Sequence, residues 1–220
     1  MKPSILSILL LLALVLTIGC QSSPDRFEGY SRNAEVDDEF ARGTDRKPSA
    51  RTLQSMARIL GSQYQDEEAR YILERCIASY PRFAAAYCDL AELHIRNGRL
   101  DLAVETLEQG RRAVPTDAVI VNNLGMCHLL EAEYEAALAL FEEAVELDPD
   151  NTRYTANRAM TLGLLGEYEQ ALEAYRGFLT DGEAHYNLAI LYEANRENPK
   201  ADEHYRRAES LGYQPEEDGE

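Results

Sequence analysis

The chain has 220 residues, of which 45% are hydrophobic and 28% charged, so it can build one sizeable domain with an apolar core. Its formal net charge is −17, and its few basic residues form no stripe. A charge of this sign repels nucleic-acid phosphates and anionic lipid headgroups. The composition therefore excludes nucleic-acid binding and charge-driven adhesion to a membrane as expected functions.

The first twenty residues have the character of an export signal. Lys2 precedes an almost wholly apolar run of 14 residues, Ile5 to Ile18. A membrane-spanning helix needs about 20 apolar residues, whereas the apolar core of a signal peptide is shorter. The run therefore favours a signal peptide, either of the ordinary kind or with lipid attachment, over an uncleaved anchor.

The run ends Leu16-Thr17-Ile18-Gly19-Cys20, which resembles the lipobox of bacterial lipoproteins, with Thr17 where Leu is usual. The resemblance implies cleavage of residues 1–19, a lipid on the Cys20 thiol and acylation of the new amine. Several acyl chains anchor a protein stably, whereas one does not. Gln21 follows the cysteine, and under the usual Gram-negative sorting it indicates the outer membrane, with the protein facing the periplasm.

Residues 20–49 carry the lipidation site and then a polar stretch of mixed charge without lasting periodicity. Gly29, Gly43, Pro24 and Pro48 interrupt it, so we expect a flexible linker that lets the folded domain stand off the membrane.

From Ala50 onward the sequence repeats, mostly every 34 residues. In the first half of each unit, apolar residues recur at i, i+3, i+4 and i+7, as in Tyr87, Leu90, Ala91 and His94, which is typical of one helical face. Proline closes the first three units, and proline cannot continue a helix. The expected units are 50–83, 84–117, 118–151, 152–181 and 182–215, followed by an acidic tail, 216–220.

Within each unit the order is large, Leu, small and aromatic, followed by Ala, aromatic and Pro. This pattern resembles the tetratricopeptide repeat and implies an all-α, right-handed solenoid of about five helix-turn-helix units. We expect small residues of the two helices to face each other, because a bulky residue there would overpack the pair. Unit four departs from the pattern at Thr155 and Arg158, so we expect a local change of superhelical twist there.

Stacked helix pairs form a concave surface that is lined by the first helix of each unit. One column on this surface reads Ser55, Asp89, Asn123, Asn157 and Asn187. In relatives with this repeat the equivalent asparagines grip the backbone of an extended peptide, and an amide offers both the donor and the acceptor for that task. The predicted partner-binding groove comprises Asp89, Asn122, Asn123, Met126, Asn157, Met160, Tyr186, Asn187 and Ile190, across units two to five. The alternative is that these amides make only local helix contacts.

Groove cations are few, because only Arg58 and Arg153 are candidates and Asp89 and Glu92 oppose them. Binding of acidic C-terminal tails is therefore not expected.

No catalytic motif, CxxC pair or cofactor fingerprint is present, so we expect no enzyme, no cofactor and no metal. His94 and His128 are one repeat apart, too far to share a metal, and are interpreted as core or interface residues. Cys76, Cys88 and Cys127 are interpreted as small buried residues, and a Cys76–Cys88 disulfide stays open.

The expected function is therefore a membrane-anchored scaffold for protein–protein interactions in the bacterial cell envelope. The arrangement of lipobox, linker and repeats resembles lipoproteins that assist in assembling a pilus or a secretion complex. The alternative is a periplasmic chaperone that holds many unfolded clients in the groove. The two differ in partner number, because a scaffold retains one or two partners and a chaperone retains many.

Overall fold

The computed structural model describes residues 47–214, so the predicted signal peptide, Cys20 and most of the linker lie outside the described residues. The described part is all-helical, as predicted. Its ten helices are α2 (Ala50–Ser62), α3 (Asp66–Ser79), α4 (Ala84–Arg96), α5 (Leu100–Ala113), α6 (Ala118–Leu130), α7 (Tyr134–Leu147), α8 (Thr152–Leu164), α9 (Tyr168–Arg176), α10 (Asp181–Ala194) and α11 (Asn198–Ser210).

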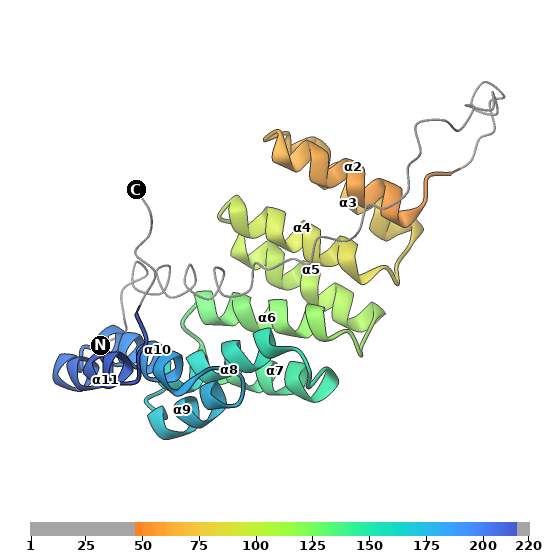
Figure 1. Ribbon diagram of the computed structural model, residues 1–220. Coiled ribbons are helices and arrows are strands. Elements are labelled where there is room, and N and C mark those ends of the chain that lie inside the picture. The colour runs from red at the N-terminus through yellow and green to blue at the C-terminus, as the bar shows by residue number, and fades with distance from the viewer. Residues whose placement is uncertain (1–46, 215–220) are drawn as a thin grey trace, which may run out of the picture.

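Successive helices pair as antiparallel hairpins, and the hairpins stack side by side into a curved solenoid (Figure 1). Helices α2 and α4, α4 and α6, and α8 and α10 are in contact. The hydrogen bond between Asn157 and Asn122 joins α6 to α8, so the even-numbered helices form one continuous layer from α2 to α10. The apolar core runs along the stack in three successive clusters, each of which joins residues of neighbouring hairpins. Each repeat therefore depends on its neighbours for the burial of its apolar face.

The turns inside the hairpins show how regular the repeat is. One residue in each turn has a positive φ: Tyr64 at 60°, Gly98 at 69°, Ala132 at 58°, Gly166 at 88° and Arg196 at 63°. Their spacing is the sequence period, including the shorter step before the last unit. Only two of the five are glycine, the residue that adopts this conformation without steric cost.

The small residues expected between the two helices of each unit are indeed buried, including Ala57, Ala91 and Ala159. At the tightest of these contacts, a Cβ added to Gly125 would lie 2.8 Å from the ring of Phe141 in α7. Gly125 therefore lets an aromatic ring pack directly against the backbone of α6.

The fourth unit differs from the others because its second helix is short. Helix α9 ends at Arg176, and Thr180 then caps α10 through a reciprocal hydrogen-bond pair with Glu183. Helix α10 packs against both α8 and α9, just as α4 packs against α2 and α3 and α6 packs against α4 and α5. In the described part of the chain, no helix is long and apolar enough to cross a membrane.

Candidate functional site

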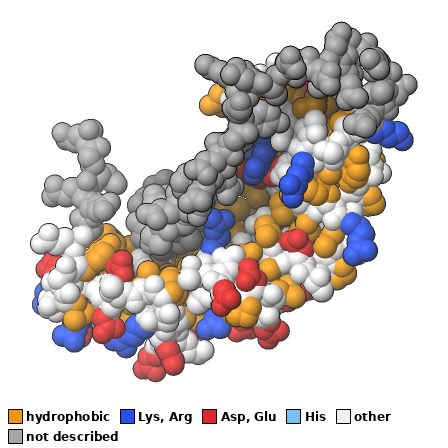
Figure 2. Space-filling model, turned by 45° about the vertical axis from the view of Figure 1, so that its right-hand side comes forward, with side chains coloured by type: hydrophobic (Ala, Val, Ile, Leu, Met, Phe, Trp, Pro, Cys, Tyr) orange, Lys and Arg blue, Asp and Glu red, His pale blue; other side chains and the backbone are white. Residues whose placement is uncertain are grey.

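A cavity of about 640 Å³ opens on the concave face of the solenoid. Its walls come from α2, α4, α6 and α8, and apolar side chains such as Ile95, Val119 and Met126 supply much of its surface. Figure 2 shows basic and acidic side chains beside a recess with hydrophobic surface. This volume lies within the range of sites that hold small ligands or short peptide segments.

Side-chain contacts between successive first helices run along this face. Gln54 Nε2 donates to Asp89 Oδ2 at 2.9 Å, the side chain of Asn123 interacts with the thiol of Cys88 and lowers its pKa, and Asn157 Nδ2 donates to Asn122 Oδ1 at 2.7 Å. We call these three contacts the side-chain ladder.

Each contact of the ladder joins residues 35 positions apart, one more than the repeat. The first residues of the three pairs occupy equivalent positions in successive units. Their partners occupy the position that follows this one, in the next unit, so each pair is separated by one repeat plus one residue. Gln54 and Cys88 were not among the predicted site residues, and this offset is the sequence signal that could have found them.

Asn157 carries an acceptor that no group of the described chain satisfies. The residue is 2% exposed and its amide donates to Asn122, yet Asn157 Oδ1 has no hydrogen-bond partner. Buried polar atoms are nearly always paired, and a buried acceptor without a donor costs about 1–3 kcal/mol. Asn157 borders the cavity, but protein atoms cover this oxygen, so an N–H group of a ligand can pair with it only after neighbouring side chains move.

The charges at the cavity are mixed. Arg58 Nε lies 3.2 Å from Asp89 Oδ2, so the carboxylate opposes the cation as expected from the sequence. Glu92, Asp117 and Arg153 also border the cavity. The surface is therefore not the cluster of free cations that capture of a carboxylate tail would need.

The structure brings together only part of the predicted groove. The cavity walls include Asp89, Asn122, Asn123, Met126 and Asn157. The cavity thus lies over units one to four rather than two to five.

The remaining predicted groove residues lie elsewhere. Met160 is 1% exposed and belongs to the core, and Ile190 packs against that same core. Tyr186 packs on the rings of Tyr205 and Tyr213, 5.4 and 4.9 Å away between centroids. Asn187 is partly buried and does not border the cavity. The physical reason is that Tyr186, Asn187 and Ile190 belong to α10, which packs on α8, α9 and α11, whereas the cavity is formed by α2, α4, α6 and α8.

The thiol of Cys88 is part of the cavity wall, but it is a poor nucleophile. Burial raises the pKa of this thiol to about 12, with a smaller contribution from the carboxylate of Asp117. The thiolate is the reactive form, so a thiol with this pKa is almost unreactive near neutral pH. The three cysteines of the described residues are free, and no Cys76–Cys88 disulfide forms.

One group of metal-ligand type lies at the turn between α6 and α7. Ligand atoms of His128, Glu131 and Glu133 lie within 4.8 Å of one another. His128 Nδ1 is, however, already paired with Glu133 Oε2 at 2.8 Å, and both carboxylates are exposed. The arrangement is explained by a surface hydrogen bond at the start of α7, so we assign no metal to it.

His94 lies in the apolar interface between helices and is 7% exposed. Burial lowers the pKa of its imidazole, and Arg99 and Arg70 lower it further. It is a core histidine, as the sequence predicted.

Comparison with family models places tetratricopeptide repeats at residues 57–118, 88–152 and 140–173, so the matches extend over more than half of the chain. Among curated proteins, the TPR repeat-containing thioredoxin TTL4 of Arabidopsis thaliana is 37% identical over 35% of this chain and 12% of its own length. A TPR repeat-containing protein of Treponema pallidum is 27% identical over 53% of this chain and 14% of its own. This chain thus spans less than a sixth of either relative.

Solved structures show the same fold. YrrB, described as a TPR protein with an unusual peptide-binding site, superposes with a TM-score of 0.58 at 23% identity, over 76% of this chain and 88% of its own. A structure of MamA protein superposes with a TM-score of 0.59 at 16% identity, over 73% and 90% of the two chains.

Proposed function

Because the chain belongs to the tetratricopeptide repeat family, whose members bind protein or peptide partners, we propose that it is a non-catalytic scaffold that holds an extended segment of a partner protein in its concave cavity. The observation that carries this proposal is the unsatisfied acceptor of Asn157 at the wall of an apolar cavity. An extended segment presents a backbone N–H at regular intervals, and such a group satisfies Asn157 Oδ1 once the side chains that cover this oxygen move aside. YrrB, which shares the fold, is described as having a peptide-binding site.

The side-chain ladder supports the same proposal by keeping the cavity in shape. Its contacts fix the spacing of α2, α4, α6 and α8 before any partner arrives. A preformed site loses less conformational entropy on binding than one that must order itself. The ladder therefore combines the predicted role of the amides with its alternative, since the same asparagines make local contacts and border the cavity.

Photocrosslinking tests where a partner binds. Val119 is 48% exposed and borders the cavity, whereas Tyr71 is 57% exposed on α3. A photoreactive phenylalanine analogue in place of Val119 should yield crosslinked adducts in cells, and the same analogue in place of Tyr71 should yield none. Adducts should diminish when Asn157→Ala is added. Equal crosslinking from both positions would show that the partner binds outside the cavity.

The number of adducts distinguishes a scaffold from the second candidate, a periplasmic chaperone. One or two partners at defined stoichiometry are expected of a scaffold. A broad set of unrelated proteins, together with suppressed aggregation of unfolded clients, is expected of a chaperone. The apolar surface near Val119 and Met126 is the observation that favours the chaperone.

The place of action proposed here is the bacterial cell envelope, with a lipid on Cys20 holding the protein to the outer membrane. This proposal rests on the apolar run Ile5–Ile18, on Gly19-Cys20 and on Gln21. Assembly of a pilus or secretion complex is the process that this arrangement resembles. Metabolic labelling with an alkyne fatty acid tests it, because Cys20→Ser should lose the label and leave the membrane fraction, whereas Cys127→Ser should keep both.

A further inference from the structure

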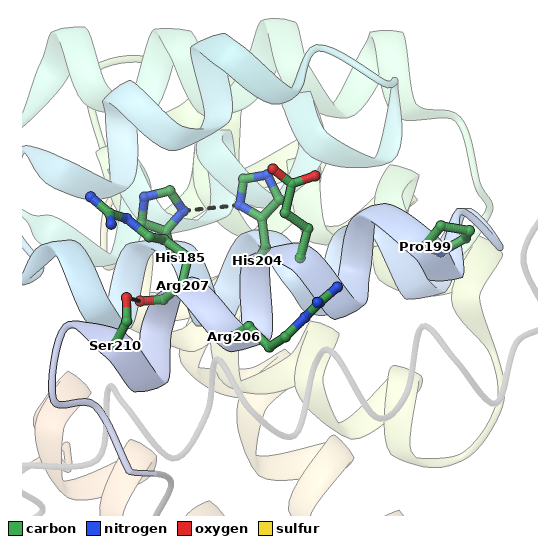
Figure 3. Close-up of a pocket in the computed structure, with 7 residues that line it drawn as sticks. His185, Pro199, His204, Arg206, Arg207 and Ser210 are labelled. Atoms are coloured by element: carbon green, nitrogen blue, oxygen red, sulfur yellow. Dashed lines mark hydrogen bonds between the residues drawn. The ribbon is translucent and has the colours of Figure 1, made fainter.

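Two histidines face each other between the last two helices. His185 of α10 and His204 of α11 approach with their Nδ1 atoms 2.9 Å apart (Figure 3). His185 is 9% exposed, and the pair borders an open pocket of about 650 Å³ away from the concave cavity. The other residues of this pocket are Pro199, Glu203, Arg206, Arg207 and Ser210.

The surroundings determine where the protons lie. Arg176 Nη2 is 3.5 Å from His185 Nε2, and a guanidinium can only donate. His185 Nε2 is therefore the acceptor, and the proton of this ring is on Nδ1. That N–H donates to Nδ1 of His204, so the proton of His204 is on Nε2.

This arrangement leaves no favourable site for a further proton. On His185 the free position is Nε2, which faces the guanidinium of Arg176. On His204 the free position is Nδ1, which already accepts the hydrogen bond from His185. A proton on either ring thus places two donors against each other, and a proton on both rings adds two cations in contact.

Charged groups reach the pair from every helix around it. From α9, Arg176 opposes protonation, and from α10, Asp181 favours it while pairing with Arg176 at 2.7 Å. The Tyr192 ring, below Lys200, lies 5.1 Å from the ring of His204.

From α11, Glu203 favours a charged His204 and Arg207 opposes a charged His185, while Arg206 borders the pocket. Burial lowers the pKa of His185 most, and His204 and Arg176 lower it further. Burial also lowers the pKa of His204.

We propose that the His185–His204 pair is an acid-sensitive latch that holds α11 on α10. At neutral pH the hydrogen bond joins the two helices. Both pKa values lie below the ordinary value of about 6.5, so the stability from the neutral pair is fully present above that value and is lost as the pH falls through the lowered pKa values. In acid α11 separates from α10 and exposes the small-residue face around Ala201 and Ala208. The latch acts apart from the concave cavity and does not rest on the proposed function.

Hydrogen–deuterium exchange of the full chain, followed in peptides from residues 47–214, tests the latch. After correction for the intrinsic pH dependence of exchange, amides of α11 should open at least about tenfold more at pH 5.0 than at pH 7.5. Amides of α6 and α7 should change far less. His204→Gln, which stays neutral and still offers an acceptor to His185, should weaken the acid effect, because His185 alone then titrates against Arg176. The double variant His185→Gln, His204→Gln should abolish the effect, whereas His94→Gln should retain it.

A second measurement keeps the proposal testable if His204→Gln does not fold. In the wild-type protein, NMR titration of the imidazole carbons should show the two rings titrating together and below the ordinary pKa of histidine. Two independent titrations near the ordinary value would overturn the latch. An acid response that is uniform along the solenoid, or that survives undiminished in the variant lacking both histidines, would overturn it as well.

Discussion

Asn157 donates its side-chain N–H to Asn122 at 2.7 Å and leaves its own oxygen unpaired at the wall of the cavity. The two residues come from neighbouring repeats, and both are almost fully buried, at 2% and 4% exposed. One amide pair therefore joins α6 to α8 and keeps an unpaired, covered acceptor beside the cavity. The contribution of this amide pair to folding stability and its contribution to partner binding can be measured separately.

The structural part is a coupling energy between the two amides. Asn122→Ala and Asn157→Ala should each destabilise the domain, because each leaves a buried group or a small void behind. The double variant should cost less than the sum of the two, by about 0.5–1.5 kcal/mol, since the hydrogen bond can be lost only once. Urea unfolding of the four proteins measures this coupling. Strictly additive losses would show that the pair contributes no net hydrogen-bond energy.

The junction between units four and five should not tolerate even one methyl group. A Cβ added to Gly163 would lie 2.3 Å from Cδ1 of Leu191, which is fully buried. We expect Gly163→Ala to lower the free energy of unfolding by about 1–3 kcal/mol through overpacking.

Gly61 is the matched control, because it occupies the equivalent position three repeats earlier. The nearest atom there is a nitrogen of the flexible Arg96 side chain at 3.4 Å. Gly61→Ala should therefore be neutral or stabilising by up to about 1 kcal/mol, since alanine favours helix. Thermal unfolding of Gly163→Ala and Gly61→Ala measures the difference in stability between them. Equal effects would contradict the packing argument.

The turn between α6 and α7 offers a stabilising substitution. Ala132 has a φ of 58°, a conformation that costs a residue with a Cβ about 1–2 kcal/mol. Ala132→Gly should raise the free energy of unfolding by about 0.5–1 kcal/mol, part of the gain being offset by the greater freedom of glycine in the unfolded chain.

Ala139 is exposed inside α7 and serves as the opposite control. Ala139→Gly should destabilise by about 1 kcal/mol, because glycine disfavours a helix interior. The midpoints of chemical denaturation of the two variants should thus shift in opposite directions from that of the wild-type protein. A loss of stability in both would mean that the positive φ carries no strain.

The start of α10 depends on a capping box. Thr180 Oγ1 accepts from Glu183 N–H at 3.3 Å, and the Glu183 carboxylate accepts from Thr180 N–H at 2.8 Å. Thr180→Ala should cost about 0.5–2 kcal/mol. Thr152→Ala, at an exposed position after the cap of α8, should cost little. Thermal unfolding followed by circular dichroism compares the two variants. An equal loss of stability in both would argue against a stabilising cap at Thr180.

The thiols of Cys88, which is half-buried, and Cys127, which is buried, should resist alkylation in the native protein. Burial raises the pKa of Cys88 and of Cys127 to about 12, so at pH 8 the thiolate fraction is roughly a thousandfold below that of an exposed cysteine. Mass spectrometry after brief iodoacetamide treatment should find both modified only in urea. Rapid native labelling of Cys88 would show that the cavity opens more widely than the structure indicates.

The sequence by itself determined the architecture of this protein. A period of 34 residues, a small residue at the same place in each unit and a helical spacing of apolar residues are local facts, and each is readable without knowing what packs against what. Because every repeat contacts mainly its neighbours, these local patterns suffice to predict hairpins stacked into a solenoid. The family, the helix pairs and the surface that the first helices share followed from them.

Only the tertiary structure decided what happens between repeats. Asn157 hydrogen-bonds to Asn122 and not to Asn123, the equivalent residue one repeat earlier, because adjacent first helices are offset by one residue. Met160 belongs to the core and does not line the cavity, and His185 faces His204 inside the last hairpin. Such contacts depend on the angle and offset between whole helices, which a periodic sequence leaves undetermined and side-chain packing fixes.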